Sequence, residues 1–215
     1  MKLIILDFDG TLADTRGLIV KTMQQTLDAL GLEPRTDVQC AAMIGLPLKQ
    51  AFTDLLPITD EIGEQCVETY RRLFNENNAL YVIPTFPNVM ETLHQLHEQG
   101  YTLTIASSRS NRSLREFVND MDLNEVIPYV LGAEDVVHAK PYPDPVLQTL
   151  KTFDCKSEDA LVVGDTWYDI EMGRRAGVRT CGVTYGNGSR EELMRAGADF
   201  LVDDFGELLK LASGK

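Results

Sequence analysis

Six short runs of apolar residues, separated by segments with helical spacing, constrain the fold of this 215-residue chain more than any other feature. The first run is Leu3–Leu6, and the others cover residues 103–106, 127–131, 161–163, 181–183 and 200–202. A short run without polar alternation is typical of a strand covered on both faces, as in a parallel sheet. The pattern predicts an α/β fold, a Rossmann-like doubly wound parallel sheet with ligands at the carboxyl ends of its strands.

The segments between these runs carry apolar residues at helical intervals. A helix is expected over residues 88–99, where Val89, Leu93 and Leu96 share one face and Gly100 provides a C-terminal cap. Further apolar stripes predict two more helices, one with Leu114, Phe117, Val118 and Met121 and one with Val146, Leu147 and Leu150.

One interval is too long for a simple strand-helix-strand unit. Nearly a hundred residues separate Asp7 from the strand at 103–106, whereas roughly thirty suffice for such a unit. The surplus is helical in spacing, with apolar stripes at Val20, Met23, Leu27 and Leu30 and at Ile62, Cys66, Tyr70, Leu73 and Phe74. We therefore expect a helical cap over residues 16–81, inserted as a lid between two pieces of the core, 1–15 and 82–215.

Composition narrows the class of partner. The net charge of −13 argues against a broad surface for nucleic acid or anionic lipid, because an acidic protein repels both. An anionic small molecule would need a local source of positive charge, such as a metal ion, a lysine or a helix N-terminus. The four cysteines form no C-x-x-C pair, and the first apolar run is too short for a signal peptide. A cytoplasmic protein, monomeric or weakly dimeric and without nucleic-acid or membrane partners, is expected.

Two aspartates follow the first predicted strand. If the strand geometry persists, Asp7 and Asp9 point to the same side, and two close carboxylates raise one pKa and attract a divalent cation. Gly10 permits a tight turn, and Thr11 places a hydroxyl near the same spot. The alternative is a plain Asp-Gly turn with no chemical role.

A second acidic pair follows the predicted strand at 161–163. Asp165 closes that strand, and Asp169, four residues later, faces the same side in the first turn of the next helix. Carboxylate oxygens from two strands suit Mg²⁺, whose remaining positions are filled by water and substrate phosphate. For Asp169 alone, the alternative is a simple helix cap.

Ser107 and Lys140 supply the features that a phosphate site needs. Ser107 ends the strand at 103–106, where its hydroxyl and the following backbone N–H could hold phosphoryl oxygens at a helix start. Lys140 lies in a loop stiffened by prolines, residues 138–145, and could provide the missing positive charge. Read singly, the serine is a helix cap and the lysine a solvated surface residue.

In order along the chain, these segments resemble the four signatures of the haloacid dehalogenase superfamily, subfamily I, the phosphoglycolate phosphatase-like group with a helical cap. The matching segments are D-F-D-G-T-L at 7–12, the strand end at Ser107, K-P-Y-P at 140–143 and G-D-T-W-Y-D at 164–169. The resemblance implies a Mg²⁺-dependent phosphatase that hydrolyses a small phosphorylated metabolite through an aspartyl-phosphate.

The resemblance also assigns catalytic roles. It implies that Asp7 is the nucleophile, Asp9 the general acid and base, and Ser107 and Lys140 the phosphoryl-binding pair. We expect Asp9 to be kept protonated by the neighbouring carboxylate and by partial burial, so that it can protonate the leaving alcohol.

The implied Mg²⁺ ligands are Asp7, the backbone carbonyl of Asp9, and Asp165, with Asp169 supporting the metal directly or through water.

Four more residues belong to the expected phosphate and substrate set: Gly10, Thr11, Ser108 and Arg109. Ser108 and Arg109 stand where many relatives have Asn and Lys, so the resemblance does not assign the substrate contacts of these two positions.

Three other functions are weighed against hydrolysis of a phosphomonoester. A 2-haloacid dehalogenase would lack the second aspartate, and a sugar-phosphate mutase would carry a cap histidine shortly after the first signature, where residues 16–21 have none. A non-catalytic Mg²⁺-binding regulator would not need Asp9, Ser107 and a large lid together.

Two features are expected to carry no chemistry. His94 and His97 lack a further ligand for zinc. Residues 186–189 are interpreted only as a loop and helix start, because they fit no dinucleotide fingerprint.

Overall fold

A six-stranded parallel sheet forms the core of the computed structural model, which describes residues 2–80 and 83–213. The strands are β1 (Leu3–Leu6), β2 (Thr102–Ala106), β3 (Tyr129–Leu131), β4 (Ala160–Gly164), β5 (Arg179–Val183) and β6 (Phe200–Val202). Their order in the sheet, β3-β2-β1-β4-β5-β6, is that of a doubly wound fold and confirms the predicted class. The third strand begins at Tyr129 rather than at residue 127, because Pro128 has no N–H for the ladder.

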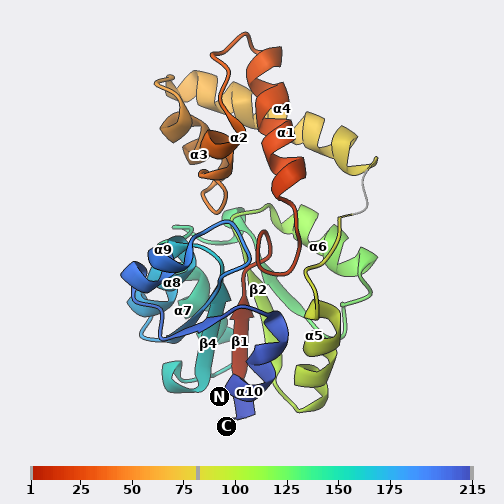
Figure 1. The fold of residues 1–215 in the computed structure, drawn as a ribbon, viewed down its shortest axis with the longest axis vertical. Coiled ribbons are helices and arrows are strands. Elements are labelled where there is room, and N and C mark those ends of the chain that lie inside the picture. The colour runs from red at the N-terminus through yellow and green to blue at the C-terminus, as the bar shows by residue number, and fades with distance from the viewer. Residues whose placement is uncertain (1, 81–82, 214–215) are drawn as a thin grey trace.

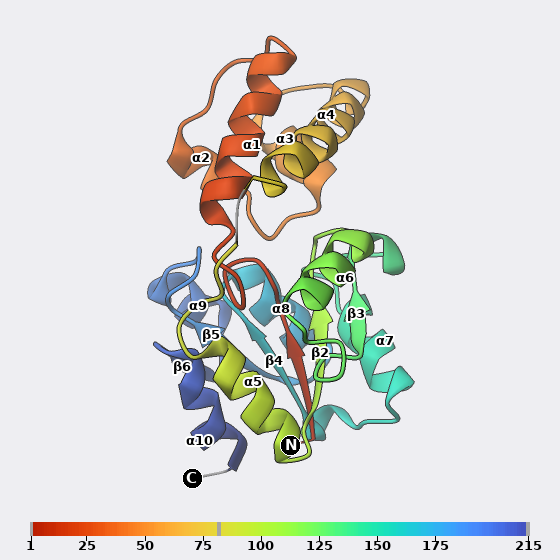
Figure 2. The same ribbon diagram turned by 90° about the vertical axis from the view of Figure 1, so that its right-hand side faces the viewer.

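Helices cover both faces of the sheet (Figures 1 and 2). Ile4 and Leu6 of β1 pack in a cluster with residues of α5, α6 and α10, whereas Leu3 and Ile5 pack on the opposite face with residues of α7 and α8. The core helices are α5 (Val89–Glu98), α6 (Asn111–Asp120), α7 (Asp144–Thr152), α8 (Trp167–Arg175), α9 (Arg190–Ala196) and α10 (Leu208–Ser213). Burial on both faces explains the continuous apolar run of β1.

One residue of the predicted α7 stripe does not belong to it. Val146 and Leu150 are buried, but Leu147 is 48% exposed. Successive residues of a helix point about 100° apart, so the neighbour of a buried residue readily faces solvent.

Four helices form a separate layer beyond the carboxyl ends of the strands, opposite the two chain termini (Figures 1 and 2). They are α1 (Arg16–Ala29), α2 (Asp37–Ala41), α3 (Leu48–Leu55) and α4 (Asp60–Asn78). This layer has its own apolar cluster, in which Met23, Leu27, Phe52 and Cys66 are almost fully buried. Leu30, expected on the first helix, lies one residue past its end. The proposed boundary between residues 81 and 82 lies outside the described residues.

None of the helices in residues 2–80 and 83–213 combines the length and the hydropathy of a membrane span.

The pairing of β1 with both β2 and β4 places three strand ends side by side. Leu6 is in register with Ile105 of β2 and with Val163 of β4. The residues that follow these strands, Asp7, Ser107 and Asp165, therefore meet at one edge of the sheet.

Candidate active site

Three buried carboxylates gather at this edge around one lysine. Oxygens of Asp7, Asp165 and Asp169 lie within 4.8 Å of one another. Lys140 Nζ is 2.6 Å from Asp7 Oδ1 and 2.5 Å from Asp169 Oδ1, and the lysine side chain is 2% exposed. The fold therefore brings together these four residues, all of which the sequence analysis proposed for the site.

Asp169 has two functions at once. Its Oδ2 accepts hydrogen bonds from the backbone N–H of Thr166 at 3.1 Å and from the Thr166 hydroxyl at 2.7 Å, while its Oδ1 faces Lys140. Gly164 makes room for it, since a Cβ there would lie 2.2 Å from the Cβ of Asp169. Asp169 therefore caps α8 and contributes to the acidic cluster.

Burial dominates the protonation of this cluster. It raises the pKa of Asp165 to about 7, with the charge of Asp169 acting in the same direction. Burial also raises the pKa of Asp7 well above its ordinary value, although Lys140 opposes the shift. Burial disfavours the charged amine of Lys140, but Asp169 and Asp7 outweigh it and raise its pKa.

The cluster has the charge and the chemistry of a metal site. Three carboxylates share one lysine, which forms ion pairs with Asp7 and Asp169, so the cluster has more negative than positive charge. Oxygen ligands from carboxylates are those that hard divalent cations prefer. Asp7, Asp165 and Asp169 could therefore hold such a cation.

Asp9 lies apart from this cluster. Strand β1 ends at Leu6, so strand geometry does not extend to Asp9. The Asp9 carboxylate accepts hydrogen bonds from Arg109 Nε at 3.0 Å, from Arg109 Nη2, and from the Thr15 hydroxyl at 2.6 Å. The sequence analysis paired Asp9 with the carboxylate of Asp7, whereas the charged partner of Asp9 in the structure is the guanidinium of Arg109. The backbone carbonyl of Asp9 as a metal ligand stays a prediction.

Gly10 and Thr11, which were expected to bind phosphate or substrate, lie against Asp165. The Thr11 hydroxyl donates to Asp165 Oδ1 at 3.1 Å, and Thr11 is fully buried. Gly10 has φ +86°, and a Cβ there would lie 2.2 Å from Asp165 Oδ2. Both residues support Asp165 and neither lines the cavity described below.

A cavity of about 680 Å³ separates the acidic cluster from the helical layer. Its floor includes Asp7, Asp9 and Ser107, and its roof includes residues 43–49, Tyr70 and Phe74. Of the three clustered carboxylates, all within the described part of the chain, only Asp7 is among the lining residues.

The segment after β2 joins the floor to the roof. The Ser107 hydroxyl accepts from the backbone N–H of Arg109 at 3.3 Å, and the Ser108 hydroxyl donates to the Gly45 carbonyl of the roof at 2.6 Å. The guanidinium of Arg109 lies 4.8 Å from the ring centre of Phe74 in α4. Ser108 and Arg109 therefore line the cavity and contact the helical layer.

A family model described as haloacid dehalogenase-like hydrolase matches residues 4–183. The chain belongs to this family. The curated relatives of this hydrolase include "Pyrophosphatase PpaX" of Anoxybacillus flavithermus, 32% identical over 97% of this chain and 95% of the relative. They also include "Probable phosphatase IndB" of Dickeya dadantii, 35% identical over 98% of this chain and 96% of the relative.

Solved structures share the fold of the hydrolase over its whole length. A hydrolase from Pseudomonas syringae is 26% identical, covers 99% of both chains and superposes with a TM-score of 0.88. A predicted phosphatase from Clostridium acetobutylicum, 24% identical, covers 100% of this chain and 99% of its own with a TM-score of 0.90, which shows the fold alone. The expected family and fold are thus confirmed.

The sequence interpretation missed Asn187. In the hydrolase, the loop 186–189 packs against Asp165, and Asn187 of this loop donates two hydrogen bonds to the Asp165 carboxylate. The signal available in the sequence was an asparagine between two glycines, four residues after the end of a predicted strand.

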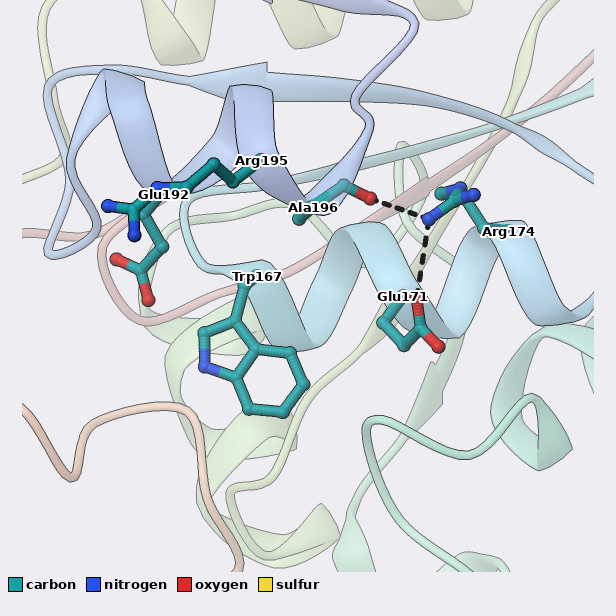
Figure 3. A pocket seen from close by; sticks show the side chains of 6 residues that line it. All are labelled: Trp167, Glu171, Arg174, Glu192, Arg195 and Ala196. Carbon is teal, nitrogen blue, oxygen red and sulfur yellow. Dashed lines mark hydrogen bonds and ion pairs between the residues drawn. The ribbon is translucent and has the colours of Figure 1, made fainter.

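A second hollow on the hydrolase lies between α8 and α9 (Figure 3) and includes none of the three carboxylates. Arg174 lies there between the Ala196 carbonyl and the Glu171 carboxylate, at 2.8 Å and 3.6 Å. Two arginines and two glutamates line this hollow, so it does not have the excess of negative charge that the acidic cluster has.

Proposed function

We propose that this hydrolase is a Mg²⁺-dependent phosphatase that hydrolyses a small phosphomonoester through an aspartyl-phosphate on Asp7. One observation carries the proposal: Asp7 belongs to the buried acidic cluster and also lines the cavity. A nucleophilic carboxylate needs both, because it must reach the phosphorus and lie beside the cation that offsets the repulsion between two anions. The relatives named pyrophosphatase and phosphatase support the same class of reaction.

In this proposal the carboxylates of Asp7, Asp165 and Asp169 hold Mg²⁺. When bound, Mg²⁺ supplies positive charge to the phosphoryl oxygens. Lys140 balances the charge of Asp7 and Asp169 and keeps their carboxylates oriented. Ser107 lies on the cavity floor, where its hydroxyl can donate to the phosphoryl group.

The reaction has two steps. An oxygen of Asp7 forms a bond to phosphorus as the bond to the leaving oxygen breaks, and Asp9 gives a proton to that oxygen. Water then attacks phosphorus, its proton goes to Asp9, and the bond between Asp7 and phosphorus breaks to release inorganic phosphate. Asp9 lines the cavity, so it can reach the leaving oxygen after giving up its contacts with Arg109 and Thr15.

The helical layer is proposed to act as the cap, covering residues 16–81 between core segments 1–15 and 82–215. The cavity between the layer and the acidic cluster has the size of a small-ligand site. Closure over a bound metabolite would exclude water other than the one that reacts.

The test is phosphate release by the purified protein with Mg²⁺ or with excess EDTA. The substrates are p-nitrophenyl phosphate, phosphoglycolate, pyrophosphate, sugar phosphates and nucleotide monophosphates. Asp7→Asn should reduce kcat by roughly 10⁴-fold or more, because the nucleophile is lost. Asp122→Asn is the matched control, since Asp122 is exposed with φ 55°, a conformation that asparagine tolerates.

Three results would contradict the proposal. Full turnover in EDTA excludes the metal, and chloride release from a 2-haloacid without Mg²⁺ indicates a dehalogenase. Mg²⁺ binding with no turnover of any substrate indicates a regulator.

A further inference from the structure

We infer that Asn187 is a positioning residue for the metal site: it fixes the Asp165 carboxylate in the orientation in which that carboxylate can bind Mg²⁺. The inference rests on the proposed function only for the identity of the cation. It gives a role to the loop 186–189, which connects β5 to α9 and carries no family signature.

Asn187 makes two contacts with the same oxygen. Its backbone N–H donates to Asp165 Oδ2 at 2.7 Å, and its side-chain amide donates to the same atom at 3.0 Å. The Thr11 hydroxyl donates to Asp165 Oδ1 at 3.1 Å. A carboxylate has about four lone-pair sites, so three donors hold Asp165 in place and leave one site for a cation.

The loop is shaped to this carboxylate by its glycines. A Cβ at Gly186 would lie 2.3 Å from the Cβ of Asp165, and a Cβ at Gly188 would lie 2.3 Å from the Asp165 carbonyl oxygen. The Gly188 N–H also donates to that carbonyl at 3.2 Å. Because both residues are glycines, the backbone of the loop can approach Asp165 at distances that a side chain would prevent.

Asp165 needs such support because of its surroundings. It is fully buried, so without these donors its carboxylate would lack hydrogen-bond partners and could turn away from this orientation. Residues that hold a metal ligand in place contribute to affinity, and their loss typically weakens metal binding by about 10 to 100-fold. Only one of the two contacts comes from the Asn187 side chain, because the other comes from its backbone. Loss of the side chain should therefore weaken metal binding by about tenfold, the lower end of this range.

The same loop offers a matched control. Ser189 accepts a hydrogen bond from the Glu192 N–H at 3.1 Å and thereby caps α9, but no contact between its side chain and Asp165 exists among the described residues. Ser189→Ala weakens the loop and the helix start without touching the metal ligand. Asn187→Ala removes the side-chain donor and retains the backbone N–H.

Calorimetric titration of the metal-free full-length protein with MgCl₂ tests the inference, with thermal unfolding measured in parallel. Trp167, the single tryptophan of the chain, lies two residues from Asp165 and gives a second readout by fluorescence. Asn187→Ala should weaken Mg²⁺ binding about tenfold, and Ser189→Ala should leave it within twofold of the wild type.

A Mg²⁺ affinity of Asn187→Ala within twofold of the wild type overturns the inference, as does an equal loss in Ser189→Ala. If Asn187→Ala does not fold, Asn187→Leu keeps the size of the side chain without its donors, and the same criteria apply. Because the titration contains no substrate, its result is independent of turnover. Failure of the wild type to release phosphate would refute the proposed function while the positioning of the metal ligand is still measured.

Discussion

The floor and the roof of the cavity are held in different ways. On the floor, Asp7 and Ser107 directly follow paired strands, and the buried carboxylates around Lys140 are fixed by backbone geometry and short hydrogen bonds. On the roof, the loop 42–47 connects the short helices α2 and α3, and Lys49 at the start of α3 is 38% exposed and pairs with exposed carboxylates. The residues proposed for the chemistry are thus held by the sheet, whereas the residues that would contact the rest of the substrate lie on a surface that can change without disturbing them.

The largest expected difference between the floor and the roof is in the effect of replacing one lysine in each region by methionine. Lys140→Met should reduce kcat/KM by about 10² to 10³-fold, on the scale of a lost electrostatic donor. It should also destabilise the metal-free protein by about 3–5 kcal/mol, because buried carboxylates lose their partner. Enzyme kinetics and urea denaturation measure the two effects.

Lys49→Met is the control on the roof and should leave the denaturation midpoint near that of the wild type, since its partners Asp60 and Glu64 are exposed. Similar midpoint shifts for the two variants would remove the distinction between floor and roof.

Arg109 tests the boundary between the two regions. Arg109→Gln should lower kcat/KM by about 10 to 100-fold, because the cavity loses a positive charge beside Asp9 and Phe74 of the helical layer loses its contact with the guanidinium. Arg115→Gln removes a neighbouring exposed arginine of α6 that is not among the residues lining the cavity, so kcat/KM should change less than about twofold. Equal effects of the two substitutions would refute a specific role for Arg109.

The pH dependence of stability is expected to come from the floor. The pKa of Asp165 is raised by burial to about 7, so between its ordinary value of 3.8 and about 7 the folded protein holds a proton that the unfolded chain has lost. Raising the pH through this window therefore lowers the stability of the metal-free protein, by up to about 1.4 kcal/mol per pH unit for one full proton.

The proposed Mg²⁺ site needs the ionised carboxylate, so the increase in Tm on adding MgCl₂ should be larger at about pH 8 than at about pH 5. Thermal unfolding with and without the ion at both pH values measures it. An increase in Tm that is the same at both pH values would contradict the assignment.

The smallest effect is expected at the roof. Gly45 has φ +101°, and a Cβ there would lie 3.2 Å from the ring of Tyr168, so Gly45→Ala should strain the loop by about 1–2 kcal/mol. A change in KM of a few-fold with little change in kcat is expected, since the loop lines the cavity and contributes no group to the reaction.

Gly17→Ala in α1 is the matched substitution. A Cβ at Gly17 meets nothing within 4 Å, and alanine favours a helix, so stability should rise by about 0.5–1 kcal/mol. Equal stability changes in the two glycine variants would contradict the strain assigned to Gly45.

The sequence alone determined the parts of this protein that depend on local pattern. Apolar runs predicted the strands, and the residues that end them, Asp7, Ser107 and Asp165, could be placed at one edge because parallel strands align their carboxyl ends. The excess length between the first two strands predicted the helical layer.

Only the tertiary structure decided the contacts between side chains that are distant in the sequence. Asp9 and Arg109 are 100 residues apart, and Asp165 and Asn187 are 22 apart, so no periodicity records their pairing. Thr11 was assigned to substrate and instead supports Asp165, because burial is a property of the packed fold and not of the residue type. Local sequence specifies where a strand ends, whereas the partner of each charged group is set by the three-dimensional packing around it.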